Sequence, residues 1–393
     1  MHLRHSFPGL LTRALSLLGD QRPEMREHEC RMPVTSYTDQ AQFTDELRLL
    51  RGRPQVVAAS AELAAAGAYV STDRLGVPIL VTRTKSGTLK AFVNVCRHRG
   101  ARIVARGTGR DIERFVCPYH SWAYDLDGSL RGIPQQFGFP TVDMTSTGLI
   151  QLDVVERLGL VWVVPDPSCA IGRAKTMIGT FASELDNDLL LASHFPFQPR
   201  EVSIRCNWKL MIDASMEAYH FKVAHRNTIG ALFANNLQLV DEFDEHMRFY
   251  LVKSNLSPEA PITEEAFDPR AYGNLLYFIF PNTFILVLPD YVQVFSFDPA
   301  SPEMTKMHEV ALLPKLPETA TELGYWNRNI ELYRSTIDED CALAESIQQG
   351  LASGANTSLT FGRFEFASCR FHAQLRHEIS RLENGDGVAH AFV

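Results

Sequence analysis

Two short cysteine–histidine motifs constrain this chain more than any other feature. Cys96-x-His98 and Cys117-x-x-His120 lie in the stretch CRHRGARIVARGTGRDIERFVCPYH, with eighteen residues between them. Hydrophobic alternation and turn residues predict short β-strands on both sides of each motif, over residues 75–165. Thiols and imidazoles at two neighbouring hairpin tips can share one metal centre. The segment therefore predicts a small all-β domain that folds around a metal site.

Two kinds of centre fit a set of two Cys and two His. A structural zinc ion accepts these ligands, but classical zinc fingers pair Cys with Cys and His with His and place a helix at the His end. A Rieske [2Fe–2S] cluster binds two Cys on one iron and two His on the other, and the neutral imidazoles raise its reduction potential. Here each loop offers one Cys and one His, which favours the Rieske cluster over the zinc ion.

Composition argues against two broad classes of function. The net charge of −8 argues against a nucleic-acid-binding protein, whose affinity depends on neutralising phosphates. No segment approaches the ~20 apolar residues that a membrane-spanning helix requires. The seven cysteines are scattered and odd in number, which predicts no disulfide framework and favours a reducing, cytoplasmic compartment.

The chain divides into three predicted parts. Residues 1–40 form an N-terminal segment whose leucines are spaced as on one face of a short amphipathic helix. Residues 41–168 contain the all-β metal-binding domain, which ends at a pair of prolines. Residues 169–393 combine several β-rich runs with a long helical stretch, from about residue 318 to 351. That pattern is typical of an α+β domain in which helices cover an antiparallel sheet, in a helix-grip-like arrangement.

A second candidate metal site lies in the sequence NWKLMIDASMEAYHFKVAH. His220 and His225 are five residues apart, about 140° around a straight α-helix, so they converge only if the helix ends or bends between them. Two His and one carboxylate form the facial triad of non-haem iron oxygenases, which leaves coordination positions open for O2 and substrate. A single helical His is usually a core residue, but a His pair beside Glu217 is harder to explain in that way.

The two motifs and their order resemble the Rieske non-haem iron oxygenases, in the catalytic alpha subunit of the ring-hydroxylating type. The likeness rests on CRHRG and CPYHSWAYDLDGSL in the first site, and on the His pair and EDCALAESIQQGL in the second. It implies that one iron of a [2Fe–2S] cluster binds Cys96 and Cys117, and that the other binds His98 and His120. Trp122 matches an aromatic position of the family, although core packing explains it equally well.

The resemblance also implies a ligand set for mononuclear iron. It assigns His220 and His225 as two ligands and Asp340 as the carboxylate. Asp338 and Glu339 are the rivals of Asp340, because a run of acids is otherwise a solvated helix face.

An acid three residues before the first His links it, in that family, to a cluster His of a neighbouring subunit. Most members carry Asp there, whereas this chain carries Glu217, as does the branch that contains carnitine and betaine oxygenases. We expect Glu217 to have this catalytic role, with Asp213 as a second candidate. A carboxylate between two imidazoles would fix their tautomers and positions.

The implied activity is that of an oxidoreductase, a mono- or dioxygenase. It would use O2 and electrons from a separate ferredoxin and/or flavin reductase to hydroxylate or oxidatively demethylate a small organic substrate. A separate reductase is needed because the chain has no G-x-G-x-x-G after a strand. We expect an aromatic substrate, as in aromatic hydrocarbon catabolism, with a quaternary ammonium compound as the alternative. The family also implies a head-to-tail homotrimer.

Three other classes of protein remain possible from the motifs alone. One is a hydrolase that uses the later His, Asp and Glu residues with zinc, but it leaves the Cys/His loops unexplained. A Rieske electron carrier would need only the first site, and so would a structural zinc protein.

The substrate pocket is expected in the run LLYFIFPNTFILVLPDYV, where strand alternation allows about half of the side chains to face inward. The candidate pocket residues are Tyr277, Phe278, Phe280, Asn282, Phe284 and Leu286.

Overall fold

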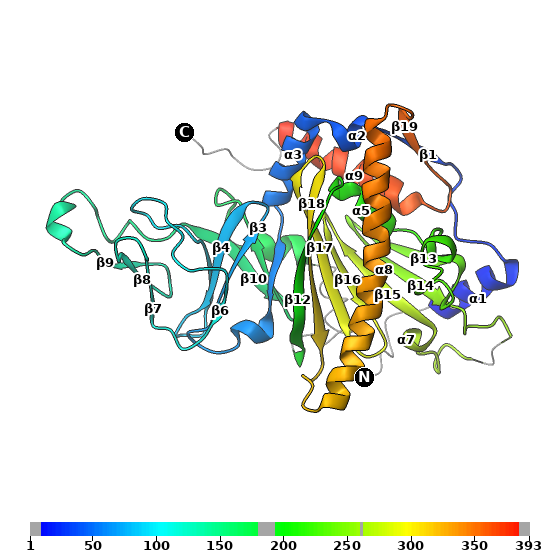
Figure 1. The fold of residues 1–393 in the computed structure, drawn as a ribbon, viewed down its shortest axis with the longest axis horizontal. Coiled ribbons are helices and arrows are strands. Elements are labelled where there is room, and N and C mark those ends of the chain that lie inside the picture. Colours follow the sequence, from blue (N-terminus) through cyan, green and yellow to red (C-terminus); the bar gives the residue numbers. More distant parts are fainter. Residues whose placement is uncertain (1–8, 180–192, 260–261, 385–393) are drawn as a thin grey trace. The chain divides into compact units, whose positions relative to one another are not determined.

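The computed structural model describes residues 9–179, 193–259 and 262–384, and Figure 1 labels its elements. The described residues form two compact units. The smaller comprises those within Arg48–Pro196, and the larger comprises those up to Leu47 together with Phe197–Glu383. This division differs from the predicted boundaries after residues 40 and 168, because the N-terminal segment is part of the larger unit.

Antiparallel strands build the smaller unit. A seven-stranded sheet has the order β2-β11-β10-β5-β4-β3-β6, and a second sheet has the order β7-β8-β9. The predicted short strands are confirmed, and two of the hairpins turn at glycines, because β4 pairs with β5 around Gly87, and β8 pairs with β9 around Gly128. Both glycines have a positive φ, which favours glycine over other residues. The elements are β2 (Gln55–Ala59), η1 (Ser60–Leu63), β3 (Tyr69–Arg74), β4 (Val77–Arg83), β5 (Leu89–Val93), β6 (Gly107–Gly109), β7 (Arg114–Val116), β8 (Ala123–Asp125), β9 (Leu130–Gly132), η2 (Gln136–Gly138), β10 (Gln151–Arg157) and β11 (Leu160–Val164).

The core of the larger unit is a seven-stranded sheet with the order β12-β18-β17-β16-β15-β14-β13. Its strands are β12 (Phe195–Ile204), β13 (Phe233–Phe243), β14 (His246–Lys253), β15 (Gly273–Ile279), β16 (Thr283–Val287), β17 (Val292–Ser301) and β18 (Met304–Leu313). Helix α8 (Ala320–Ala352) lies along this sheet (Figure 1), and its Ile330 packs against Tyr291, Ala311 and Leu313. The predicted α+β domain with a helix over an antiparallel sheet is confirmed.

The remaining elements of the larger unit come from both ends of the chain and from its middle. They are α1 (Leu10–Asp20), β1 (Cys30–Pro33), α2 (Thr35–Thr38), α3 (Gln40–Arg51), α5 (Trp208–Ser215), α6 (Phe221–Ala224), α7 (Pro269–Tyr272), β19 (Ser358–Phe361) and α9 (Phe366–Glu383). The predicted helix near the N-terminus is α1, with its leucines buried at residues 10 and 11. Strand β1 pairs with β19 from the other end of the chain.

A buried ion pair attaches helix α3 to helix α5. The Lys209 ammonium donates to both carboxylate oxygens of Glu46, at 2.6 and 2.7 Å, and the Trp208 indole N–H donates to the same carboxylate at 2.8 Å. All three side chains are buried. Desolvation lowers the pKa of Lys209, and the charge of Glu46 opposes that shift. Removing either partner would leave a buried charge uncompensated, so the pair fixes the start of α5.

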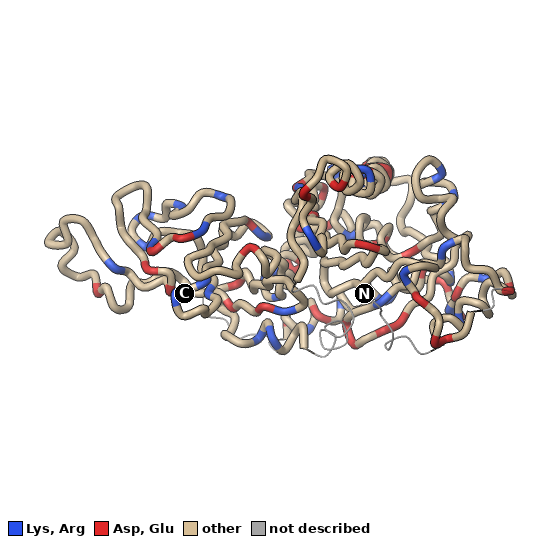
Figure 2. Tube along the Cα trace, turned by 90° about the horizontal axis from the view of Figure 1, so that it is seen from below, with Lys and Arg blue, Asp and Glu red and all other residues tan. Residues whose placement is uncertain are grey.

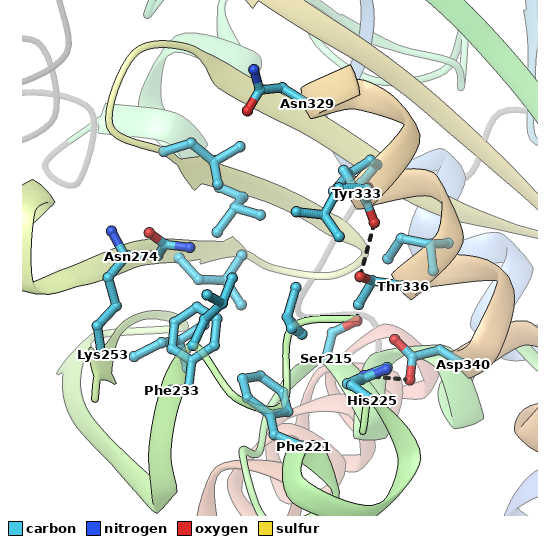
Figure 3. Close-up of a pocket in the computed structure, with 18 of the residues that line it drawn as sticks. Ser215, Phe221, His225, Phe233, Lys253, Asn274, Asn329, Tyr333, Thr336 and Asp340 are labelled. Atoms are coloured by element: carbon cyan, nitrogen blue, oxygen red, sulfur yellow. Dashed lines mark hydrogen bonds and ion pairs between the residues drawn. The ribbon is translucent and has the colours of Figure 1, made fainter. Parts of the chain in front are cut away.

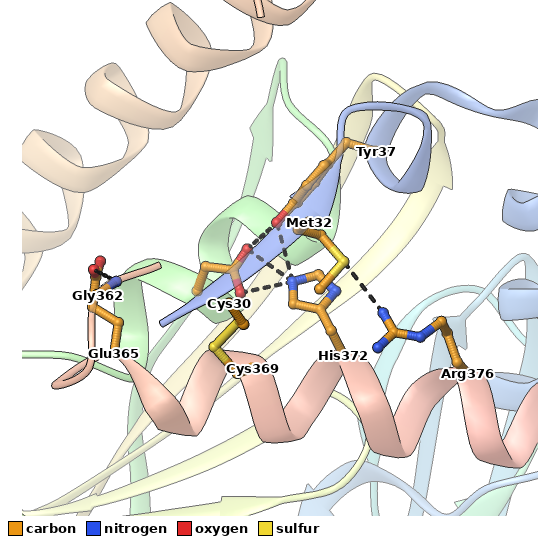
Figure 4. Close-up of a disulfide and its surroundings, with 9 residues drawn as sticks. Cys30, Met32, Tyr37, Gly362, Glu365, Cys369, His372 and Arg376 are labelled. Carbon is orange, nitrogen blue, oxygen red and sulfur yellow. Dashed lines mark hydrogen bonds and ion pairs between the residues drawn. A yellow bond between two sulfur atoms is a disulfide. The ribbon is translucent and has the colours of Figure 1, made fainter. Parts of the chain in front are cut away.

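A disulfide joins Cys30 in β1 to Cys369 in α9 (Figure 4). The prediction of no disulfide framework is therefore corrected for this pair, which is 339 residues apart in the sequence. Pairing of β1 with β19, which precedes α9, brings the two thiols together. The other five cysteines are free.

The described helices include none that is both long and apolar enough to cross a membrane. Acidic and basic residues are interspersed along the trace of each unit (Figure 2).

We expect a Cys30→Ser variant to unfold at a lower urea concentration than the wild-type protein. A cross-link that closes a loop of this length restricts the unfolded chain, and its loss typically costs about 2–5 kcal/mol of unfolding free energy. Urea unfolding followed by circular dichroism, with and without an anaerobic phosphine reductant, measures the effect. The reductant should lower the midpoint of the wild-type protein to that of the variant and leave the variant unchanged. A wild-type midpoint that ignores the reductant would mean that the thiols are not joined.

Candidate functional site

Two loops of the same design carry the Cys/His motifs in the smaller unit. In each loop the cysteine N–H donates to the carbonyl five residues later, at 2.8 Å for both Cys96 and Cys117. Each loop also contains one residue at positive φ, Gly100 in the first and Ser121 in the second. The N–H of each of these two residues donates to the carbonyl of the cysteine of its loop, at 3.0 Å. The repeated turn presents one Cys and one His from each loop.

The donor atoms of the two loops suit a [2Fe–2S] cluster. Cys96 and Cys117 are buried, whereas His98 is half-buried and His120 is exposed, and the two imidazole rings are 4.6 Å apart between centroids. The Nδ1 atom of His98 is buried without a hydrogen-bond partner among the described residues. Desolvation lowers the pKa of His98, and His120 adds to the effect, so the neutral imidazole that a metal requires is favoured. Thiols inside and imidazoles outside could each bind one iron of the cluster.

Two aromatic residues after the second motif support these loops. Trp122 is buried and stacks on the imidazole of His98, with 5.0 Å between ring centroids and 5° between planes. It therefore packs in the core and also orients His98. The hydroxyl of Tyr124 lies 3.4 Å from the Cys96 sulfur and accepts a hydrogen bond from the Arg97 N–H at 3.0 Å. With its proton retained, that hydroxyl can donate to a thiolate at Cys96.

We expect a Tyr124→Phe variant to lower the reduction potential of the cluster. A donor to a ligating sulfur stabilises the reduced cluster, which carries more negative charge, so its loss favours the oxidised form. If the bond is worth about 1.4 kcal/mol more in the reduced state, the shift is about 60 mV for one electron. Dye-mediated potentiometric titration followed by visible absorption measures it. A Tyr69→Phe variant, whose ring packs in the same unit against Phe115, is the control. An unchanged potential in Tyr124→Phe would remove the proposed donor.

Three side chains of the larger unit converge on one point. The Nε2 atoms of His220 and His225 are 3.0 Å apart, and Oδ1 of Asp340 lies 3.1 Å from the His225 nitrogen and 3.5 Å from the His220 nitrogen. One donor atom from each of the three lies within 4.8 Å of the other two. Two imidazole nitrogens and a carboxylate at these separations can hold one divalent cation and leave positions open for other ligands.

A break in the helix brings the His pair together. The sequence predicted that the two side chains converge only if the helix ends or bends, and the structure confirms the interruption. Helix α5 ends at Ser215 and α6 begins at Phe221, so His220 and His225 flank the single turn of α6. Helix α8 then supplies Asp340 from the distant part of the chain.

Two glutamates bind the outer nitrogens of the histidines. Glu217 contacts Nδ1 of His220, and Oε2 of Glu339 lies 2.8 Å from Nδ1 of His225. A proton on each Nδ1 leaves each Nε2 free to bind a cation, so the two carboxylates fix the required tautomers. Desolvation lowers the pKa of His225, but the hydrogen bonds and charges of Asp340 and Glu339 outweigh it, so the pKa is raised overall.

The acidic run on α8 is divided among three environments. Asp340 faces the histidines, Glu339 binds His225 and accepts a hydrogen bond from Thr228 at 2.7 Å, and Asp338 pairs with Arg200 at 2.7 Å on the exposed side. Sequence reasoning treated Glu339 only as a rival ligand and missed its position behind His225. No signal for that contact was present in the sequence beyond its place next to Asp340.

Asp213, the second candidate for the bridging acid, lies elsewhere. Its carboxylate accepts a hydrogen bond from the Tyr37 hydroxyl at 2.7 Å and lies 3.0 Å from Nε2 of His372. Both partners come from the ends of the chain that the disulfide joins (Figure 4). Asp213 is thus part of a buried polar network, and Glu217 is the acid in contact with a candidate ligand.

A cavity of about 350 Å³ begins at the candidate ligands and runs between the sheet and α8 (Figure 3). His220, His225 and Asp340 line one part of it together with Glu217. Its aromatic lining comes from α6, from the sheet with the turn between β16 and β17, and from α8, and consists of Phe221, Phe233, Tyr291, Phe295, Tyr325 and Tyr333.

Five of the six predicted pocket residues do not line this cavity, namely Tyr277, Phe278, Phe280, Asn282 and Phe284. Leu286 does line it. Strand alternation turns Tyr277 to the face of the sheet opposite Leu276, which lines the cavity. Phe278 and Phe280 lie further along the chain and pack against Phe371 of α9.

The other two corrected residues are also part of the packed sheet. Phe284 stacks on Phe295 with 5.1 Å between ring centroids, and the Asn282 side chain donates to the Phe297 carbonyl at 3.0 Å. The prediction placed the cavity in the correct sheet but at the wrong point along its strands.

Two domain families match the two units. Residues 53–143 match the Rieske [2Fe-2S] domain, and residues 191–381 match the ring hydroxylating alpha subunit (catalytic domain). The chain belongs to the Rieske non-haem iron oxygenases. Such an oxygenase is an oxidoreductase with a Rieske [2Fe–2S] cluster and a catalytic domain for mononuclear iron, and the donor atoms of both sites fit these groups.

Curated relatives of this Rieske oxygenase act on quaternary ammonium compounds. The carnitine monooxygenase oxygenase subunit of Acinetobacter baumannii is 28% identical over an alignment of 337 residues that covers 82% of this chain and 85% of that protein. The glycine betaine monooxygenase oxygenase subunit of Chromohalobacter salexigens is 26% identical over 393 residues, with 88% and 85% covered. The chloroplastic choline monooxygenase of Arabidopsis thaliana is 28% identical over 367 residues, with 88% and 82% covered.

Solved structures confirm the fold of the Rieske oxygenase. The quaternary ammonium Rieske monooxygenase CntA in complex with L-carnitine aligns with a TM-score of 0.73 at 23% identity, covering 88% of this chain and 95% of that one. Naphthalene 1,2-dioxygenase from Rhodococcus sp. bound to indole aligns with a TM-score of 0.70 at 18% identity, covering 96% and 99%. The fold is therefore common to oxygenases with different substrates.

Proposed function

We propose that this Rieske oxygenase oxidises a quaternary ammonium compound. The observation that carries the proposal is the lining of the cavity beside His220, His225 and Asp340. Aromatic rings from several elements surround it, and a further carboxylate, that of Glu217, lines it beside His220. Aromatic faces and carboxylates both attract a cation that cannot donate hydrogen bonds. The activities of the curated relatives support the same substrate class and favour it over the aromatic substrate expected from the sequence.

We further propose the ligands of the two metal groups. Cys96 and Cys117 would bind one iron of the cluster and His98 and His120 the other, in line with the buried thiols and the outer imidazoles. The buried and unpartnered Nδ1 of His98 supports this arrangement.

For the mononuclear iron we propose His220, His225 and Asp340. When bound there, the iron supplies O2 activation, and O2 with two electrons and two protons gives one oxygen atom to a C–H bond and the other to water. Glu217 and Glu339 keep the protons on the outer nitrogens of the two histidines. Oxygenation at a carbon attached to nitrogen gives a product that can release an aldehyde and an amine.

The electron donor in this proposal is a separate ferredoxin and/or flavin reductase. The solved structure of a quaternary ammonium Rieske monooxygenase gives insight into inter-subunit electron transfer in that enzyme. We propose a homotrimer in which Glu217 connects His220 of one subunit to the cluster of the next. A head-to-tail contact of this kind forms a closed ring.

A single-turnover experiment tests the substrate class. The protein is reduced anaerobically with dithionite, mixed with glycine betaine, carnitine, choline or an aromatic acid, and exposed to ¹⁸O2. We expect labelled product, or the aldehyde and amine derived from it, with at least one quaternary ammonium compound. Mass spectrometry detects either outcome. Oxidation of the aromatic acid alone would reject the proposed substrate class and restore the aromatic one.

A further inference from the structure

Two polar side chains line the cavity away from the candidate iron ligands. They are Lys253, the last residue of β14, and Asn274 in β15. Strand pairing places Leu251 opposite Asn274, so Lys253, two residues further along the same face, is the diagonal neighbour of Asn274. Figure 3 shows both side chains on the side of the cavity opposite His225 and Asp340.

The amide oxygen of Asn274 lacks a hydrogen-bond partner among the described residues. Its side chain is buried, with only 7% of the residue exposed, and its Oδ1 atom makes no hydrogen bond with a described residue. Buried polar atoms are normally paired, so an unpaired one on a cavity wall indicates a polar ligand. A flip of the amide presents either its oxygen or its NH2 group to that ligand.

The Tyr333 hydroxyl is a second atom of this kind. Tyr333 is 8% exposed, lines the same cavity, and its hydroxyl has no partner among the described residues. Burial raises the pKa of Tyr333 well above its ordinary value, so the hydroxyl keeps its proton and can donate. The cavity is therefore prepared for a ligand with more than one polar group.

Lys253 brings a positive charge to this wall. Its ammonium donates to the Arg270 carbonyl at 2.9 Å, which uses one of three N–H groups. It forms no ion pair with a carboxylate of any described residue, although it is half-buried. Desolvation lowers its pKa, and the more distant charges of Asp268 and Asp290 oppose that shift. A partly desolvated ammonium that forms no direct ion pair favours an anionic ligand.

The wall at Lys253 and Asn274 thus suits an anion, and the aromatic rings together with Glu217 and Asp340 suit a cation. We propose that the substrate is a zwitterion whose carboxylate binds the Lys253 ammonium and the Asn274 amide, while its quaternary ammonium group lies toward His220, His225 and Asp340. This inference rests on the proposed function and narrows it. Glycine betaine, carnitine and γ-butyrobetaine have both charges, whereas choline lacks the anion.

Ligand affinities of the wild-type holoenzyme test directly whether the cavity binds a carboxylate. Calorimetry under anaerobic conditions compares γ-butyrobetaine with its methyl ester, which keeps the ammonium group and removes the negative charge. We expect the acid to bind about tenfold more tightly or better, as a charge-assisted contact implies. Equal affinity for the acid and the ester would overturn the proposal, whatever the behaviour of any variant.

The same affinity measurements on variants then test whether Lys253 and Asn274 bind the carboxylate. In Lys253→Met the ratio of the affinity for the acid to the affinity for the ester should fall to near one. Lys253→Arg should keep most of the wild-type ratio. Asn274→Leu should reduce the ratio by a smaller factor. The matched control is Lys306→Met, because Lys306 is a half-exposed lysine of β18 that lies 3.7 Å from Glu201 and does not line the cavity. An unchanged ratio in a folded Lys253→Met protein would exclude Lys253 as the anion site.

A third ligand separates this inference from the proposed function. Benzoate carries the carboxylate without the ammonium group. If benzoate binds through Lys253 and no quaternary ammonium compound binds, the proposed function fails and the zwitterion is excluded with it. If choline binds as tightly as γ-butyrobetaine and is oxygenated, the proposed function stands and only the zwitterion is excluded.

Discussion

An Asp340→Ala variant will contain about two irons per chain where the wild-type protein contains about three, and its oxygenation rate will fall by more than about 100-fold. The carboxylate lies 3.1 Å from Nε2 of His225, on the side where the imidazole nitrogens converge. Two histidines alone hold a divalent cation weakly, so iron leaves this site. The cluster lies in the other unit and should keep its visible and reduced EPR spectra. Iron and sulfide analysis with product formation in a reductase-coupled assay measures both effects.

Variants of Asp338 and Glu339, which precede Asp340 in the sequence, are the controls for Asp340→Ala. Asp338→Ala removes only a surface pair with Arg200, so iron content and rate should stay near wild-type values. Glu339→Gln loses the carboxylate charge behind His225, and we expect iron affinity or rate to fall about 10–100-fold. If Asp340→Ala kept its third iron while Glu339→Gln lost it, Glu339 would be the ligand.

A Cys96→Ala variant will lose the visible absorption of the cluster and all reductase-dependent turnover. Cys96 is buried between Tyr124 and the second loop, so no other described thiol in that unit except Cys117 is placed to bind the same iron. The larger unit has its own core and should keep one iron per chain. Absorption spectra, labile sulfide and iron analysis of the anaerobically purified variant measure the result.

The control for this variant is Cys169→Ala. Cys169 is a buried free cysteine of the same unit that packs beside Val164 and Ala174. That protein should remain brown and active. Zinc with no sulfide in the wild-type protein, even after anaerobic reconstitution, would instead support the structural zinc site that the motifs alone left open.

The sequence predicted the two loops and the His pair because their chemistry is local. A Cys and a His two or three residues apart must lie on one loop, so the ligand set follows from spacing. The break between α5 and α6 also followed, since His220 and His225 cannot meet on a straight helix. The choice of Asp340 needed the family resemblance, because three consecutive acids differ only in where each points from the helix.

Other features depend on contacts between distant segments. Alternation along β15 and β16 tells which side chains share a face, but not which end of that face lies beside His220. The pair of Cys30 and Cys369 and the Glu46 contact with α5 join segments more than 150 residues apart, as the disulfide separation of 339 and the hydrogen-bond separation of 163 show. Neither pairing leaves a local pattern in the sequence.

Helix α8 sets the distance between two parts of the cavity lining. Asn329, Tyr333, Thr336 and Asp340 lie on one stripe of it, so the helical side of the cavity and a candidate iron ligand belong to one continuous helix. Asn329 and Asp340 are eleven residues apart, or about 16 Å along the axis. The helix therefore limits the length of ligand that fits between Asn329 and Asp340. Substitutions at Asn329 can change this limit without moving Asp340.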